Sequence, residues 1–280
     1  MTGLTDEDIA MARAAIGRSE RRREVLDTQS LRRFSVAIGG EGDVGGRRPV
    51  LAHWAWFLPT PLDGEIGADG HPLRGGFLPA IAALPRRMFA ATAIRFEAPL
   101  LLDAEAEAVT RIADVRHKAG RTGELVFVDI ERSIAQRGAV CVTERQTLVY
   151  RAAGDGAPLA LPTPDGAAHV AAEGGAVWTP STVQLFRFSA VTFNGHRIHY
   201  DRPYATAIEG YPALIVHGPF VAAKLAEMAA GSGVLAHFAF RAQAPCFVDQ
   251  PIRLGPAGDG AFHAIRCDGA IATVAQAGYR

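Results

Sequence analysis

Cysteine is scarce in this sequence, and its scarcity limits the kinds of site that the chain can carry. Three of the 280 residues are cysteine, Cys141, Cys246 and Cys267, and no two of them have the CxxC spacing. An odd number of widely separated cysteines argues against a disulfide framework and against a zinc site. The N-terminus is acidic and has no apolar signal core, so we expect a protein of the reducing cytoplasm.

An excess of charge of one sign and long apolar runs are absent as well. Lys and Arg together number 29, as do Asp and Glu, and no basic stripe stands out, so we expect no nucleic-acid partner. No uninterrupted apolar run approaches the ~18 residues that would indicate a membrane span. With 49% hydrophobic and 21% charged residues, the composition is that of a globular protein of one large or two ordinary domains.

Runs of β-branched and apolar residues predict two groups of strands, and hence an α+β fold with an antiparallel sheet. The expected strands lie at about 94–96, 106–115, 125–131 and 140–150, and again at about 234–243, 247–254, 262–267 and 270–277. A helix is expected to begin at Thr5, where Asp8 completes an approximate capping box. A second helix is expected between Pro219 and Gly231, and its small and apolar residues predict that it is largely buried.

The sequence contains an internal repeat. The pattern T-x-x-L-x-R-F-S occurs at 28–35 and again at 182–189, a separation of 154 residues, and the halves end alike at Tyr150-Arg151 and Tyr279-Arg280. We therefore predict domains at 1–151 and 181–280, joined by an Ala-, Gly- and Pro-rich linker at 152–180. The same separation places Gly40 and Gly45 opposite Asn194 and His199, so we expect the first half to be catalytically silent scaffold and part of the cleft.

Polar residues that suit acid–base chemistry gather near the start of the buried helix. A neutral imidazole such as His199 can take and return a proton near pH 7, and Asn194 could hold a water. The N–H of Gly218, at the helix start, could polarise a thioester carbonyl, although a plain Gly-Pro helix start explains it equally well. His196 and His199 could share a metal, but apart from Asp201 no ligand completes a set, so we expect none.

The segment Asn194–Asp201, followed by His217-Gly218, resembles the hydratase-2 motif of MaoC-like enoyl-CoA hydratases, roughly D-x-N-P-[IL]-H-x-D and then H-G. The resemblance implies that His199 is the catalytic histidine and that Gly218 forms the oxyanion site. Asn194 stands where the family has its catalytic Asp, and His196-Arg197 stands where it has Asn-Pro. Only one strong base is then present, so the family's two-residue scheme does not transfer unchanged.

The segments at 53–59, 74–79 and 84–88 resemble the N-terminal dehydratase domain of the mesaconyl-CoA hydratase branch of the same family. This resemblance implies a double hot-dog fold, two antiparallel sheets each wrapping a central helix. It also implies a hydro-lyase that adds water reversibly to a 2-enoyl-CoA thioester, with 3-methylfumaryl-CoA (mesaconyl-CoA) or itaconyl-CoA as candidate substrates. CoA is then part of the substrate, no cofactor is needed, and we expect a homodimer.

Four further residues are candidate substrate contacts: Arg86, Arg87, His217 and Tyr200. The two arginines could bind a carboxylate by a charge-assisted fork, but a CoA phosphate or a solvated surface explains them as well. Two other functions stay open at this point. One is a hot-dog acyl-CoA thioesterase, and the other is a non-catalytic acyl-thioester binding subunit, which the Asn at position 194 favours.

Overall fold

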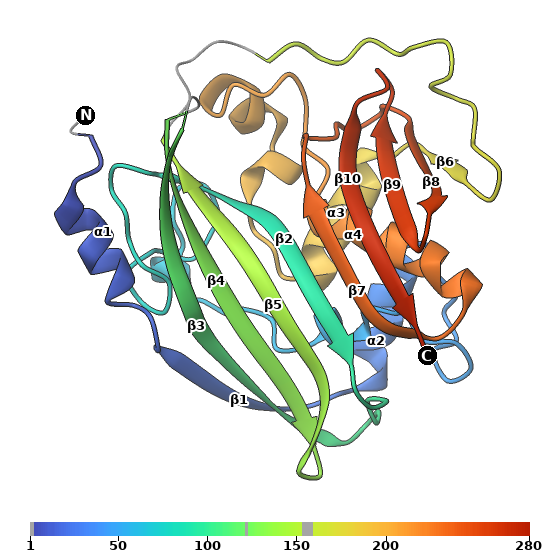
Figure 1. Cartoon of the computed structure of the whole chain (residues 1–280), viewed down its shortest axis with the longest axis horizontal. Coiled ribbons are helices and arrows are strands. Elements are labelled where there is room, and N and C mark those ends of the chain that lie inside the picture. The colour runs from blue at the N-terminus through green and yellow to red at the C-terminus, as the bar shows by residue number, and fades with distance from the viewer. Residues whose placement is uncertain (1–2, 121–122, 153–158) are drawn as a thin grey trace.

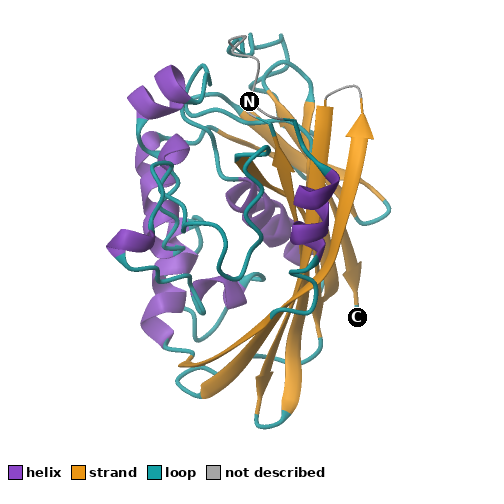
Figure 2. Ribbon diagram, turned by 90° about the vertical axis from the view of Figure 1, so that its left-hand side faces the viewer, coloured by secondary structure: helices purple, strands orange, loops and turns teal. Residues whose placement is uncertain are grey.

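The computed structural model describes residues 3–120, 123–152 and 159–280, and it shows one antiparallel sheet of ten strands with most helices on one face (Figures 1 and 2). The strands are β1 (Ser19–Val25), β2 (Arg86–Phe96), β3 (Glu105–Gly120), β4 (Gly123–Gln136), β5 (Ala139–Arg151), β6 (Ala176–Trp178), β7 (Leu235–Ala242), β8 (Ile252–Gly258), β9 (Ala261–Arg266) and β10 (Ile271–Tyr279). The helices and helical turns are α1 (Asp6–Arg13), α2 (Thr28–Ala37), η1 (Ala52–Ala55), η2 (Asp63–Glu65), α3 (Thr182–Val191), η3 (Arg197–His199), η4 (Tyr204–Ile208), α4 (Gly218–Ala229) and η5 (Ala230–Ser232). Within these residues no helix is long and apolar enough to cross a membrane.

The order of the strands has a mirror relation about its centre. It runs β1-β3-β4-β5-β2-β7-β10-β9-β8-β6, so each strand of the first half has a counterpart at the same distance from the β2–β7 junction. At that junction Ala91 to Arg95 pair with Arg241 to His237. The two sheets that we expected are thus joined edge to edge into one (Figure 1).

The predicted α+β class with an antiparallel sheet is confirmed. Three strands differ from the prediction, and each difference has a local cause. β1 was not predicted because its seven residues are all exposed and mostly charged, which suits a sheet edge that must not pair further. β8 begins later than expected because Asp249 has a left-handed φ of 59° and Pro251 lacks an N–H. β6 lies inside the predicted linker 152–180, so the end of that stretch belongs to the sheet, while 153–158 lie outside the described residues.

The sequence repeat is visible in the backbone. α2 and α3 begin at Thr28 and Thr182, and the turn after each contains the same hydrogen bond, from the Gly40 N–H to the Ser35 carbonyl and from the Asn194 N–H to the Ser189 carbonyl, both 2.8 Å. The residue before each donor has a left-handed φ, 86° at Gly39 and 49° at Phe193. The structure therefore sets Gly40 opposite Asn194, as the separation of 154 residues predicted.

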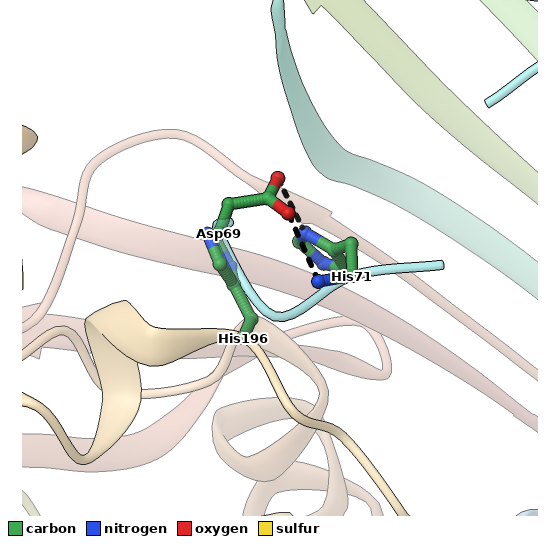
Figure 3. A group of neighbouring side chains, drawn as sticks. All are labelled: Asp69, His71 and His196. Atoms are coloured by element: carbon green, nitrogen blue, oxygen red, sulfur yellow. Dashed lines mark hydrogen bonds and ion pairs between the residues drawn. The ribbon is translucent and has the colours of Figure 1, made fainter. Parts of the chain in front are cut away.

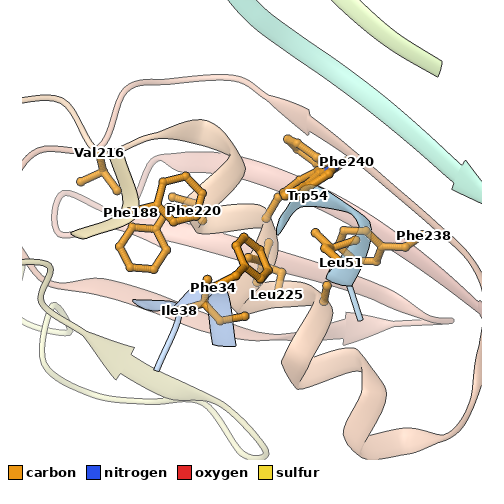
Figure 4. Packing of buried hydrophobic residues seen from close by; sticks show 14 of the residues in the cluster. Phe34, Ile38, Leu51, Trp54, Phe188, Val216, Phe220, Leu225, Phe238 and Phe240 are labelled. Atoms are coloured by element: carbon orange, nitrogen blue, oxygen red, sulfur yellow. The ribbon is translucent and has the colours of Figure 1, made fainter. Parts of the chain in front are cut away.

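One hydrophobic cluster spans both halves, and Figure 4 shows aromatic rings from each half in contact. The rings of Phe34 and Phe188 lie 6.3 Å apart between α2 and α3, and Phe188 stacks on Phe220 of α4 at 4.6 Å. α4 is largely buried, as predicted. The first half differs, because in chain order the four-residue turn η1 stands between α2 and β2 where α4 stands between α3 and β7.

Candidate active site

A cleft of about 1470 Å³ lies between the two halves, and residues of both halves line it. It exceeds the ~300–1,000 Å³ of typical small-molecule pockets and therefore has room for a long acyl thioester. The predicted residues that line it are His199, Asn194, Gly218, Arg87, His217 and Tyr200. Arg86 is absent from the lining.

His199 ends the short turn η3 and is buried, with 7% of its surface exposed. Its Nδ1 lies 2.8 Å from the carbonyl oxygen of Ile215. A carbonyl only accepts, so Nδ1 carries the proton and Nε2 of the neutral ring keeps its lone pair. Burial, and next the nearby His196, lower the pKa of His199 to about 3. At pH 7 the ring is thus a neutral base with one free nitrogen.

His217 packs against this ring and holds it in place. The two rings stack with centroids 3.6 Å apart, and His217 Nε2 is hydrogen-bonded to Ser189 Oγ at 2.8 Å. Burial, followed by the charge of His199, lowers the pKa of His217 well below its usual value. Within the described residues its Nδ1 is buried and has no hydrogen-bond partner. The contacts of His217 are those of a positioning residue, and its predicted contact with substrate remains a prediction.

Gly218 is the first residue of α4, at the positive end of the helix dipole. Its N–H makes no hydrogen bond to any described residue, and the next residue, Pro219, has no N–H to offer. A Cβ added to Gly218 would meet no atom within 4 Å, so a ligand can approach this backbone closely. The position therefore suits a developing oxyanion.

The side chains of Asn194 and Tyr200 each make a hydrogen bond within their own loop. The Asn194 side-chain oxygen accepts a hydrogen bond from the His196 N–H at 3.0 Å, and its NH₂ group has no partner among the described residues. The half-exposed Tyr200 donates its hydroxyl to the Gly195 carbonyl at 2.9 Å. Asp201 forms an ion pair with Arg197 at 2.7 Å. This contact stabilises the loop, so Asp201 does not act as a partner of the histidines.

The first half adds two residues that the sequence did not reveal, Asp69 and His71, which meet His196 in Figure 3. Asp69 Oδ2 lies 3.2 Å from His71 Nδ1, and the His71 and His196 rings are 4.0 Å apart. The two loops meet at glycines, since a Cβ on Gly70 would lie 1.9 Å from the Gly195 carbonyl oxygen. The residues are over 120 positions apart and no spacing pattern links them, so no sequence signal marked this contact.

Asp69, His71 and His196 could in principle hold a metal ion, because their ligand atoms all lie within 4.8 Å of one another. Their surroundings oppose it. Arg74 Nη2 lies 3.7 Å from Asp69 Oδ2, and the charges of Arg74 and Arg87 already act on His71. Two guanidinium groups disfavour a nearby dication, so the cluster is better explained as a hydrogen-bonded carboxylate–imidazole pair.

The adjacent arginines of β2 have different environments, because neighbouring strand residues point to opposite faces. Arg86 Nε lies 3.3 Å from Glu209 Oε2, and Arg86 also donates to the Glu209 carbonyl at 2.9 Å. Arg87 lines the cleft, opposite Tyr150 of β5. The predicted fork of Arg86 and Arg87 is not formed, and of these two only Arg87 lines the cleft.

Comparisons with known proteins identify the family of the chain. The family model for hydroxyacyl-thioester dehydratase type 2 matches residues 51–248. The chain is 47% identical to the mesaconyl-C(4)-CoA hydratase of Chloroflexus aurantiacus, over 74% of this chain and 73% of that protein.

Two solved structures share the fold. A MaoC-like dehydratase from Phytophthora capsici matches with a TM-score of 0.66 and 14% identity over 97% of both chains. A Mycobacterium tuberculosis protein with a double hotdog fold matches with a TM-score of 0.52 and 13% identity over 94% of this chain and 95% of that one. The expected double hot-dog fold is thus confirmed. On the family match and the 47% identity, the chain belongs to the hydroxyacyl-thioester dehydratase type 2 family of hydro-lyases.

Proposed function

We propose that the chain reversibly adds water to a 2-enoyl-CoA thioester. The observation that carries this proposal is the meeting of two complementary groups in one cleft, the free Nε2 lone pair of His199 and the unpartnered N–H of Gly218. The first suits proton transfer with water and the second suits an oxyanion. Such a pair serves conjugate addition, in which negative charge develops on the thioester oxygen.

The chemistry balances with one acid–base group. His199 Nε2 takes a proton from water as the water oxygen bonds to the β-carbon, and the electron pair of the double bond moves toward the thioester oxygen. The Gly218 N–H stabilises the resulting enolate, and the NH₂ group of Asn194 holds the water. The imidazolium of His199 then returns the proton to the α-carbon, which restores the neutral ring.

We further propose that the acyl group is dicarboxylic, as in 3-methylfumaryl-CoA or itaconyl-CoA. The name of the Chloroflexus relative, mesaconyl-C(4)-CoA hydratase, supports the first of these. CoA is part of the substrate, and no other cofactor or metal is proposed. A homodimer and a cytoplasmic location remain predictions, which light scattering and fractionation of cells would test.

The direct test is a panel of enoyl-CoA thioesters with and without a distal carboxylate. Hydration removes the conjugated double bond, so the absorbance of the enoyl thioester should fall without release of free thiol. A thiol reagent in a parallel assay detects hydrolysis, and thiol release at the rate of substrate loss would indicate a thioesterase instead. Tight binding of the panel with neither change would indicate an acyl-thioester binding subunit.

A further inference from the structure

We propose that Arg87 and Arg74, backed by the buried hydroxyl of Tyr150, form a subsite that binds a free carboxylate on the acyl group of the substrate. The subsite deepens the proposed function and rests on it. It is built by three separate parts of the first half: β2, the loop before it, and β5. Three observations lead to it.

The first observation is a charge that lacks a counter-charge. Arg87 is part-buried in the cleft wall, and within the described residues no carboxylate forms an ion pair with it. Its neighbour Arg86, by contrast, is paired with Glu209. A desolvated guanidinium without a partner is costly, and a bound anion removes that cost.

The second observation is an unused polar group beside that charge. The side chain of Tyr150 is fully buried, and its hydroxyl has no hydrogen-bond partner among the described residues. Tyr150 stands directly across from Arg87 in the pairing of β5 with β2, and the Arg74 guanidinium lies 5.9 Å from the centre of its ring. Burial raises the pKa of Tyr150, so the hydroxyl keeps its proton and can donate. The charges of Arg87 and Arg74 both act on this hydroxyl, and these two arginines line the cleft although Tyr150 itself does not. Two guanidinium groups side by side in the cleft wall match a carboxylate.

The third observation is the position of the subsite relative to the reacting groups. The charge of Arg87 acts on both His71 and His196, and the His196 ring lies 5.4 Å from that of His199. The phosphates of CoA are separated from the thioester by the whole pantetheine arm, so they cannot reach this point while the double bond lies at His199. A carboxylate attached near the reacting carbons can. Asp69 pairs with Arg74 at 3.7 Å and is hydrogen-bonded to His71, but no ion pair joins it to Arg87, which leaves that guanidinium for the ligand.

The test compares two substrates that differ only in the proposed group. 3-Methylfumaryl-CoA carries a carboxylate where 3-methylcrotonyl-CoA carries a methyl group. In Arg87→Gln, kcat/KM for the first should fall roughly 10–100-fold, the equivalent of one charged hydrogen-bonded contact, while that for the second changes little. Arg74→Gln and Tyr150→Phe should shift the same ratio by smaller factors, and Arg95→Gln, an exposed arginine on the same strand, should not shift it.

A binding measurement separates this inference from the proposed function. Succinyl-CoA and butyryl-CoA are unreactive as hydratase substrates, so calorimetry can compare their affinities without turnover. Wild type should prefer succinyl-CoA, and Arg87→Gln should lose the preference. Equal losses for both ligands, or loss of the preference in Arg86→Gln but not in Arg87→Gln, would overturn the subsite while hydration continued. If wild type hydrates neither enoyl-CoA but still prefers succinyl-CoA, the proposed function fails and the subsite stands.

Discussion

Each half of the molecule buries a histidine beside a short helical turn, and the two histidines have different partners. In the first half, Nε2 of His53 lies 3.6 Å from Oε2 of Glu144, and both side chains are 1% exposed. In the second half, the one hydrogen bond that the His199 ring makes to the described residues is to the backbone carbonyl of Ile215. His53 directs its Nε2 at a carboxylate, which suits a structural role. His199 uses only its Nδ1, so its Nε2 remains free to accept a proton.

The surroundings of Glu144 support the structural role of the first pair. Its Oε1 accepts hydrogen bonds from Trp54 at 3.1 Å, Thr92 at 3.2 Å and Gln146 at 3.0 Å. Burial alone would raise the pKa of Glu144, but the adjacent His53, 3.6 Å away, holds it at about 2. The polar network thus sits at η1, the turn that stands in the first half where α4 stands in the second.

The largest expected difference between the two histidines is in activity. His199→Gln should lower kcat for enoyl-CoA hydration by roughly 10²–10⁴-fold, the usual contribution of one acid–base group. His53→Gln should leave the kcat of the folded protein close to that of wild type, because His53 is absent from the cleft lining. Steady-state kinetics on both variants decides this, and near-normal turnover in His199→Gln would refute the role of that residue.

The next largest effect is on stability. Here we expect substitution at the His53–Glu144 pair to cost more than substitution of His199. Glu144→Gln should reduce the free energy of unfolding by about 3–5 kcal/mol, because removing one partner of a buried pair leaves the other uncompensated. Urea denaturation measures the loss, and His199→Gln is the matched control. If the His199 variant proves the less stable of the two, the division into a structural and a chemical site is wrong.

A smaller effect appears in the dependence of stability on pH. The pKa of His199 is about 3 in the folded chain and near its ordinary value of 6.5 when unfolded, so below pH 6.5 the unfolded state binds more protons. Stability from this group is therefore present above pH 6.5 and is lost as the pH falls toward 3. His199→Gln should reduce the slope of unfolding free energy against pH by about 1.4 kcal/mol per unit near pH 5. An unchanged slope would mean that His199 is already charged in the folded protein.

The sequence predicted the parts of this site that lie close together in the chain. The apolar helix, its Gly-Pro start and the repeat could be predicted because each depends on local periodicity or sequence identity. His199, Asn194 and Gly218, which were predicted from the same stretch, all line one cleft. Asp69 and His71 were not readable, because they reach His196 through a loop contact between distant glycines. The different positions of Arg86 and Arg87 could not be predicted without knowing that both lie on strand β2. The alternation of side chains along this strand directs Arg87 into the cleft and Arg86 away from it.

Ser35 and Ser189 occupy matching positions of the repeat, and we expect their substitution to have the smallest effects. Ser35 Oγ donates to the Glu41 carbonyl at 2.7 Å, and its counterpart Ser189 is hydrogen-bonded to His217 at 2.8 Å. Each alanine variant loses one hydrogen bond, worth about 1 kcal/mol. Ser35→Ala should lose less than this, because Glu41 is exposed and water can replace the hydroxyl.

Ser189→Ala should lose more, since it leaves the His217 ring without any hydrogen bond to the described residues. It should also lower kcat by about 10-fold, because the loosened His217 ring no longer fixes His199, with which it stacks at 3.6 Å. KM should change little, since neither serine is argued to bind the substrate. Parallel urea denaturation and kinetics on both variants measure the two effects. A kcat that falls equally in Ser35→Ala would show that the first half is more than scaffold for the proton transfer.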